Sequence, residues 1–288
     1  MNSAKPVPIK QAGELGELLR YWRDARGKSQ LDLSLDSGFS QRHLSFIESG
    51  RSTPGRQALL DIAQALDIPL RERNTLLLSA GYAPIYSEND WSAPEMQSIT
   101  RALERALQQH DPFPAVVIDR YWYVLMRNES APRFFNQFID LEARNTPRNL
   151  LHLMFDPRGM RPFIINWPDV AASLIQRVYR ESIGRIVDEK TKELLAQLRM
   201  YPGVKAEWKT PQSPSALPFI PIGFAHKGKR LNFFSLITTV GAPVSITAQE
   251  FRIECMFPAD DESEKNYLEL MAGQSAPPQP NHDQRSGR

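Results

Sequence analysis

Cysteine is almost absent from this chain of 288 residues, which contains Cys255 alone. A single cysteine excludes an internal disulfide and any metal site built from several thiolates. Phe251, Ile253 and Phe257 alternate with it as on a strand. We therefore interpret Cys255 as a buried, unreactive thiol rather than a nucleophile.

Long apolar runs and a strong net charge are missing as well. No stretch of about 18 apolar residues could span a membrane, and the N-terminus lacks a signal-peptide core, so we expect a cytoplasmic protein with no membrane partner. The formal charge is +2, and residues 1–83 account for all of it with 11 basic and 9 acidic side chains. Such a balance favours a few placed contacts with nucleic acid over broad electrostatic attraction. The length fits about two domains.

Catalytic and metal-binding motifs are the third absence. The sequence has no phosphate-cradling Gly-rich loop, no nucleophile elbow and no His-Glu-x-x-His. The histidines are scattered, with no two at metal-ligand spacing: His43, His110, His152, His226 and His282. We expect no enzyme, no metal and no cofactor beyond a possible bound fatty acid. An enzyme of unassigned chemistry fused to a DNA-binding module is the rival hypothesis, which a turnover assay would test.

What the sequence does contain is a helix-turn-helix pattern between Ser29 and Pro54. Ser29 can cap a first helix, on which Leu31 and Leu35 lie one turn apart, and Gly38 can end it in the left-handed conformation. Ser40 can then cap a second helix.

On that second helix, Leu44 and Ile47 point inward and the polar side chains are left to face outward. Arg is suited to guanine and Gln to adenine, and the loop after Gly50 is well placed for phosphates. The predicted DNA-contacting residues here are Ser40, Gln41, Arg42, His43, Ser45, Arg51 and Ser52. The alternative is an all-helical packing module with a polar surface.

Flanking helices complete a bundle over residues 11–83. The i, i+3, i+4, i+7 spacing of one apolar helix face occurs twice, in Leu15, Leu18, Leu19 and Trp22, and again in Leu59, Ile62, Ala63 and Leu66. A further helix is predicted from about Leu70 to Ala80.

Two prolines between Tyr82 and Pro94 mark the domain boundary. Residues 84–110 form a linker and a connecting helix from about Glu95 to His110. Its apolar stripe consists of Ile99, Leu103, Ala106 and Leu107, which either packs within its own domain or forms a dimer contact. Residues 271–288 are Gly-, Ser-, Pro- and Gln-rich and are predicted to be disordered.

Residues 111–262 alternate between strand and helix patterns. The predicted strands cover 115–119, 121–126, 219–226, 231–240 and 249–257, and the predicted helices cover 128–137, 150–155, 169–182 and 188–200. Five strands with helices inserted between the second and third match a PAS-like sheet covered on one face. Its dense aromatic residues form either a solid core or the walls of a ligand pocket.

Long segments in both halves resemble XRE-type helix-turn-helix regulators of the MmyB-like family. The resemblance extends from about Leu15 to Asp260. It is carried by Ser-Gln-Leu-Asp-Leu from Ser29, Arg-His-Leu-Ser-Phe-Ile-Glu-Ser-Gly-Arg from Arg42, Pro-Leu-Arg-Glu-Arg-Asn from Pro69, Ile-Asn-Trp from Ile165, Tyr-Pro-Gly-Val from Tyr201, and Glu-Phe-Arg-Ile-Glu-Cys-Met-Phe-Pro-Ala-Asp from Glu250. It implies a multidomain α and α+β protein with an N-terminal five-helix, lambda-repressor-like bundle and a C-terminal PAS-like antiparallel sheet with helices.

The resemblance also implies a function: a transcription regulator that binds double-stranded DNA and whose PAS-like domain binds a small hydrophobic, fatty-acid-like ligand. It implies that Gln30 contacts a phosphate and that Gln41, Arg42 and Ser45 read the groove. We expect a homodimer. The alternative for the second domain is a protein-interaction or dimerisation platform without a small ligand.

An acidic ligand head would need a polar partner, because an unpaired carboxylate in an apolar cavity costs several kcal/mol. The candidates for the head are Arg127, Asn128, Asn166 and Arg252, and those for the walls are Trp122, Trp167 and Phe234. Arg252 alternates with apolar neighbours and has a second interpretation, in which it lies on the solvent face beside Glu254.

Overall fold

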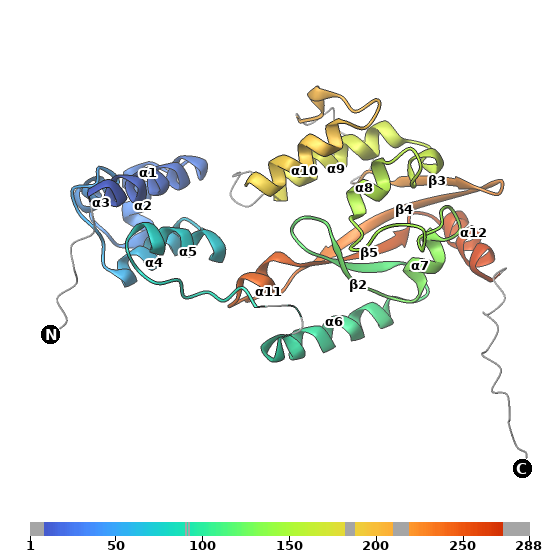
Figure 1. Cartoon of the computed structure of the whole chain (residues 1–288), viewed down its shortest axis with the longest axis horizontal. Helices are drawn as coiled ribbons and strands as arrows, with labels where there is room; N and C mark the ends of the chain where they lie inside the picture. The colour runs from blue at the N-terminus through green and yellow to red at the C-terminus, as the bar shows by residue number, and fades with distance from the viewer. Residues whose placement is uncertain (1–8, 90, 92, 182–187, 210–218, 273–288) are drawn as a thin grey trace, which may run out of the picture.

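The computed structural model describes residues 9–89, 91, 93–181, 188–209 and 219–272. A helical bundle is followed by a five-stranded sheet with helices (Figure 1). This confirms the predicted fold class. Most of the segment predicted to be disordered, residues 273–288, lies outside the described residues.

The bundle consists of α1 (Ile9–Ala25), α2 (Gln30–Ser37), α3 (Gln41–Glu48), α4 (Arg56–Ala65) and α5 (Leu70–Ser79). The two predicted apolar stripes meet in its core, where Leu15, Trp22 and Ile62 are almost fully buried. The bundle is therefore held together by the residues that the helical spacing identifies.

The ends of α2 and α3 confirm the predicted caps. Ser29 and Asp32 form a reciprocal capping box at the start of α2, and Gly38 ends that helix with a φ of 75°. The Ser40 hydroxyl accepts a hydrogen bond from the His43 backbone N–H. An apolar pair one helical turn apart usually marks the buried face of a helix, but on α2 the pair is exposed. Leu31 and Leu35 are 53% and 76% exposed, and Leu33 is the buried side chain.

The sheet is antiparallel throughout, with the order β2-β1-β5-β4-β3. Its strands are β1 (Ala115–Ile118), β2 (Val124–Arg127), β3 (Ile222–His226), β4 (Lys229–Thr238) and β5 (Arg252–Pro258). β2 begins later than predicted, because Asp119 Oδ1 accepts from the Tyr121 and Tyr123 N–H groups and holds a turn in which Trp122 has a φ of 69°.

Helices cover both faces of the sheet, which corrects the expectation of one covered face. Between the second and third strands lie α7 (Ser130–Phe135), α8 (Leu150–Phe155), α9 (Trp167–Glu181) and α10 (Glu189–Arg199), with 3-10 turns at Arg161–Phe163 and Ala206–Lys209. Val116 and Ile118 of β1 face the core that these helices share, whereas Ala115 and Val117 face α6 (Gln97–Gln109) on the opposite side (Figure 1).

The apolar stripe of α6 packs within its own domain. Leu103 and Leu107 are buried against β1 and β5, and a 3-10 turn at Pro94–Met96 precedes the helix. Of the two alternatives for this stripe, packing within its own domain is confirmed, and the dimer contact is not supported, because the sheet of the same chain covers Leu103 and Leu107.

Two helices were not predicted: α11 (Ile246–Glu250), which precedes β5, and α12 (Asp261–Ala272), which follows it. Tyr267 and Met271 of α12 are buried in the same core as α7 to α10. The signal for α12 is present in the sequence, since Asp260 caps the Ser263 N–H at 2.7 Å and three acidic side chains occupy the first turn.

Candidate functional site

The outer side of α3 and the loop after it form a polar surface. Gln41 and Arg42 are exposed, while Leu44 and Ile47 on the other side of the helix are buried. The face that the sequence predicts to contact DNA is therefore the solvent-facing one.

The ring of Phe46 supports two arginines of this surface. The Arg42 and Arg51 guanidinium groups lie over its ring, at 5.4 and 5.9 Å from the centroid. The loop folds back onto α3, because the Arg51 and Ser52 N–H groups both donate to the Phe46 carbonyl at 2.8 and 3.1 Å. The arginine predicted to read bases and the arginine predicted to lie near phosphates thus share one aromatic ring as their support.

The other side chains predicted to contact DNA differ in their exposure to solvent. Ser40 is exposed, whereas Ser45 and Ser52 are partly buried. His43 is partly buried with its ring edge-to-face against Phe39 at 5.7 Å. All of these side chains lie on α3 or in the loops beside it, and their contact with DNA stays a prediction.

Gln30 is engaged inside the bundle. Its side-chain amide donates to Glu48 at 2.9 Å, and Arg23 Nε donates to the same carboxylate at 2.7 Å. Burial alone would raise the pKa of Glu48, but the hydrogen bonds from Arg23 and Gln30 outweigh it and hold that pKa below its ordinary value. The network joins α1, α2 and α3 and so fixes the angle at which α3 faces solvent.

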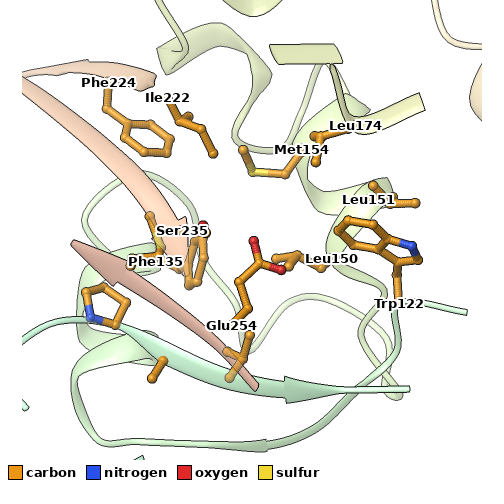
Figure 2. Close-up of a pocket in the computed structure, with 14 residues that line it drawn as sticks. Trp122, Phe135, Leu150, Leu151, Met154, Leu174, Ile222, Phe224, Ser235 and Glu254 are labelled. Carbon is orange, nitrogen blue, oxygen red and sulfur yellow. The ribbon is translucent and has the colours of Figure 1, made fainter. Parts of the chain in front are cut away.

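The second candidate site is an internal cavity between the sheet and helices α7 to α9. Its cavity volume is about 30 Å³, room for no more than a few water molecules between the lining side chains shown in Figure 2. The apolar lining consists of Pro114, Ala115, Val116, Trp122, Phe135, Leu150, Leu151, Met154, Leu174, Ile222, Phe224 and Met256. Ligand pockets usually measure roughly 300 Å³ or more, so a small organic molecule could enter here only if lining side chains moved aside.

Ser235 and Glu254 provide the polar part of the lining. Glu254 is 6% exposed, and both of its carboxylate oxygens accept from Arg177 Nη1, at 3.1 and 3.2 Å. The Arg177 guanidinium also lies 4.3 Å from the centre of the Trp122 ring, and its Nε donates to Glu181 at 2.5 Å. Burial lowers the pKa of Arg177, but the charges of Glu254 and Glu181 outweigh this and raise it overall, so the guanidinium is charged.

Of the predicted ligand residues, Trp122 alone lines this cavity. Asn128 is buried and shapes the backbone instead: its oxygen accepts from the Ala115 and Ala131 N–H groups, and its nitrogen donates to Asp111 and Phe113. Asn166 similarly ties the Pro221 carbonyl and the Gly223 N–H to the start of α9.

The other four predicted residues lie elsewhere. Trp167 is buried beneath the Arg161 guanidinium at 3.7 Å, and Phe234 stacks between Phe219 and Phe257. Arg127 is exposed and borders a separate cavity.

Arg252 faces the helices, so its solvent-face interpretation is wrong. Its side chain is 12% exposed and approaches Glu181 at 3.1 Å. Burial lowers the pKa of this guanidinium. A ligand-binding role for these residues stays a prediction.

The cysteine on the same strand, Cys255, is partly buried, and burial raises the pKa of its thiol, in keeping with an unreactive group.

Sequence reasoning missed Arg177 and Glu254. Glu254 has the same strand parity as Arg252, which is a detectable signal for a shared face. α9 carries two arginines, Arg177 and Arg180. The residue type alone did not indicate that Arg177 is buried while Arg180 is exposed.

A network of charged side chains connects the bundle to the sheet domain. Arg71 of α5 donates to Glu250 at 2.7 Å and to Glu88 at 2.7 Å. Glu250 also accepts from Arg120, which pairs with Asp188 at the start of α10. Beside this network, the Leu70 N–H at the start of α5 donates to the Gln249 side chain at 2.8 Å.

Within the described ranges, no three His, Cys, Asp or Glu side chains gather as a metal site. None of the helices that the structure describes is long and apolar enough to cross a membrane.

Comparison with known proteins gives matches in both halves of the chain. Residues 99–270 match the MmyB-like transcription regulator ligand binding domain, and residues 19–73 match a helix-turn-helix family. A stretch of 95 residues is 35% identical to the uncharacterized HTH-type transcriptional regulator y4dL of Sinorhizobium fredii (strain NBRC 101917 / NGR234). That match covers 32% of this chain and 48% of the relative, so the chain spans about half the length of the relative it matches.

Proposed function

This chain belongs to the MmyB-like transcription regulator family, and on that premise we propose how its two halves work. It is a DNA-binding transcription regulator. We propose that α3 and its flanking loops contact the operator, and that the cavity beside Trp122 binds a small hydrophobic ligand with a fatty-acid-like chain. The observation that carries the ligand proposal is the cavity itself, whose apolar walls contain one charged side chain, Glu254, which is paired with Arg177 behind the lining.

The magnitude of apolar burial supports such a ligand. Burying roughly ten methylenes at about 0.8 kcal/mol each contributes about 8 kcal/mol before ordering costs, which corresponds to micromolar binding. The free space is narrow, so the ligand must displace lining side chains. Met154 can adapt most easily, because its side chain is unbranched and flexible.

We further propose that the regulator acts as a homodimer in the cytoplasm, without catalytic activity. Two copies of the bundle would contact half-sites about one helical turn of DNA apart. Because α6 is occupied by its own sheet, we expect the dimer to form through another surface. Light scattering of the purified protein, alone and with operator, tests this state.

Native and denaturing mass spectrometry of the purified full chain tests the ligand proposal. We expect a co-purified small molecule with an alkyl chain at about one per subunit. Leu174→Trp, which fills the cavity, should abolish the bound mass, whereas Leu268→Trp on the exposed side of α12 should not. An empty protein that also fails to take up fatty acids or other alkyl-chain molecules would instead favour a protein-interaction platform.

A further inference from the structure

The polar side chains that line the cavity determine which ligand head group can bind there. Glu254 is the charged side chain among the described residues that line it. Figure 2 shows its carboxylate rising from β5 toward the middle of the apolar side chains, between Ser235 on one side and Leu150 on the other. A ligand that fills this space therefore meets a carboxylate.

The charges around Glu254 are already balanced. Arg177 pairs with Glu254 at 3.1 Å and with Glu181 at 2.5 Å, and Arg252 approaches Glu181 at 3.1 Å. The four side chains are between 8% and 20% exposed. Two guanidinium groups and two carboxylates leave no net charge, so an ionised ligand head would add an uncompensated charge in a poorly solvated region.

The balanced cluster still has hydrogen-bonding capacity to spare. Both Glu254 oxygens bond to the same nitrogen, Arg177 Nη1, and keep free lone pairs. Arg177 is 9% exposed, and its Nη2 is buried with no hydrogen-bond partner among the residues described. Of this pair only Glu254 lines the cavity, so a ligand there can offer a donor to its carboxylate.

We propose that the cavity selects a neutral head group that carries a hydrogen-bond donor, such as a hydroxyl or a primary amide, over an ionised carboxylate. A hydroxyl donates to Glu254 without changing the charge of the cluster. A carboxylate could only accept, and it would face Glu254 directly. This inference rests on the proposed function, since it specifies the ligand of the same cavity.

Titration calorimetry on the full chain, stripped of bound lipid, tests the inference with decanol, decanamide and decanoate. At about pH 8 the free acid is ionised. We expect the alcohol and the amide to bind at least about tenfold more tightly than decanoate, which is a difference of about 1.4 kcal/mol.

Glu254→Gln removes the opposing charge while keeping the side-chain shape. In this variant decanoate should gain at least about tenfold relative to decanol, because the cluster then carries one excess positive charge. Glu262→Gln, on the exposed side of α12, is the matched control and should leave the order of affinities unchanged. Circular dichroism verifies that both variants fold.

The outcomes separate the inference from the function on which it rests. Equal or tighter binding of decanoate by the unmodified protein would overturn the inference while leaving a hydrophobic ligand in place. If none of the three probes binds, the cavity is not a ligand site, and the proposed function falls with the inference. The comparison in the unmodified protein decides the question even if Glu254→Gln fails to fold.

Discussion

Arg42 is the side chain on which base contact depends most. It is exposed and held over Phe46, so its guanidinium is preorganised at the surface of α3. We expect Arg42→Ala to weaken operator binding by about 1 to 3 kcal/mol, as for loss of a bidentate base contact. Fluorescence anisotropy at fixed salt measures this, with Arg101→Ala on the exposed side of α6 as the control. Unchanged affinity would remove Arg42 from the set of base-contacting residues.

Glu48 supports the same surface from inside the bundle. Its pKa is held below the ordinary value by Arg23 and Gln30, despite burial. Its stabilising contribution is therefore fully present above the unfolded-state pKa and is lost as pH falls through the folded-state pKa. We expect Glu48→Gln to destabilise the bundle by about 2 to 4 kcal/mol near neutral pH, because Arg23 keeps its charge without its partner.

Thermal unfolding as a function of pH tests this expectation. The difference between the unmodified protein and Glu48→Gln should begin to shrink as pH falls below the unfolded-state pKa of about 4.3, and it should vanish only below the lowered folded-state pKa, where the carboxyl is protonated in both states. Asp61→Asn, on the exposed side of α4, is the control. A difference that does not depend on pH would mean that shape, and not charge, explains the role of Glu48.

At the scale of elements, the sequence pattern predicted where helices begin and end better than it predicted what each helix packs against. The caps at Ser29, Gly38 and Ser40 were predictable because each depends on backbone and side-chain groups within a few residues. The stripe on α6 was predictable as an apolar face, but not its partner, since an apolar stripe fits a sheet or a second subunit equally well. The start of β2 was missed because periodicity does not report a turn held by the Asp119 side chain.

The contact between α1 and α3 makes a prediction about Gly16. A Cβ built there would lie 2.4 Å from the Glu48 carbonyl oxygen, so the two helix backbones touch. Alanine favours a helix over glycine by about 1 kcal/mol, but overpacking against backbone costs about 1 to 3 kcal/mol and should exceed that gain. We expect Gly16→Ala to lower the melting temperature of the bundle, measured by circular dichroism.

Gly55→Ala is the matched control, because no atom lies within 4 Å of a Cβ at that position. It should change the melting temperature much less than Gly16→Ala. A stabilised Gly16→Ala protein would show that α1 can shift away from α3 without loss.

At the scale of the whole molecule, the cavity is assembled from segments far apart in the chain. Trp122 comes from the turn before β2, Leu174 from α9 and Glu254 from β5. Of the three side chains predicted for the walls, only Trp122 lines the cavity, and the side chains chosen for the head were polar groups near aromatic residues in sequence. Asn128 and Asn166 proved to satisfy backbone groups, which is a common use of buried amides and has no distinct sequence signature.

One continuous segment, the helix α11 followed by the strand β5, connects this cavity to the helix-turn-helix bundle. Gln249 and Glu250 contact the start of α5, and Glu254, four residues further along the chain, lines the cavity. A ligand that shifts β5 therefore acts on the same backbone that holds the bundle. We expect a coupling free energy of about 1 to 3 kcal/mol between ligand and operator binding. Arg71→Gln should reduce it toward zero, because the bundle then loses its ion pairs to Glu250 and Glu88.

Operator affinity measured with the cavity filled and emptied gives this coupling, and ligand affinity with and without operator must give the same value by linkage. Arg105→Gln, on the exposed side of α6, is the control that should keep the coupling. Coupling that persists in Arg71→Gln would exclude this network as the route and leave the connecting helix α6, which packs on Phe251 and Ile253, as the remaining one. Equal operator affinity in both states of the unmodified protein would mean that the domain binds its ligand without sensing it.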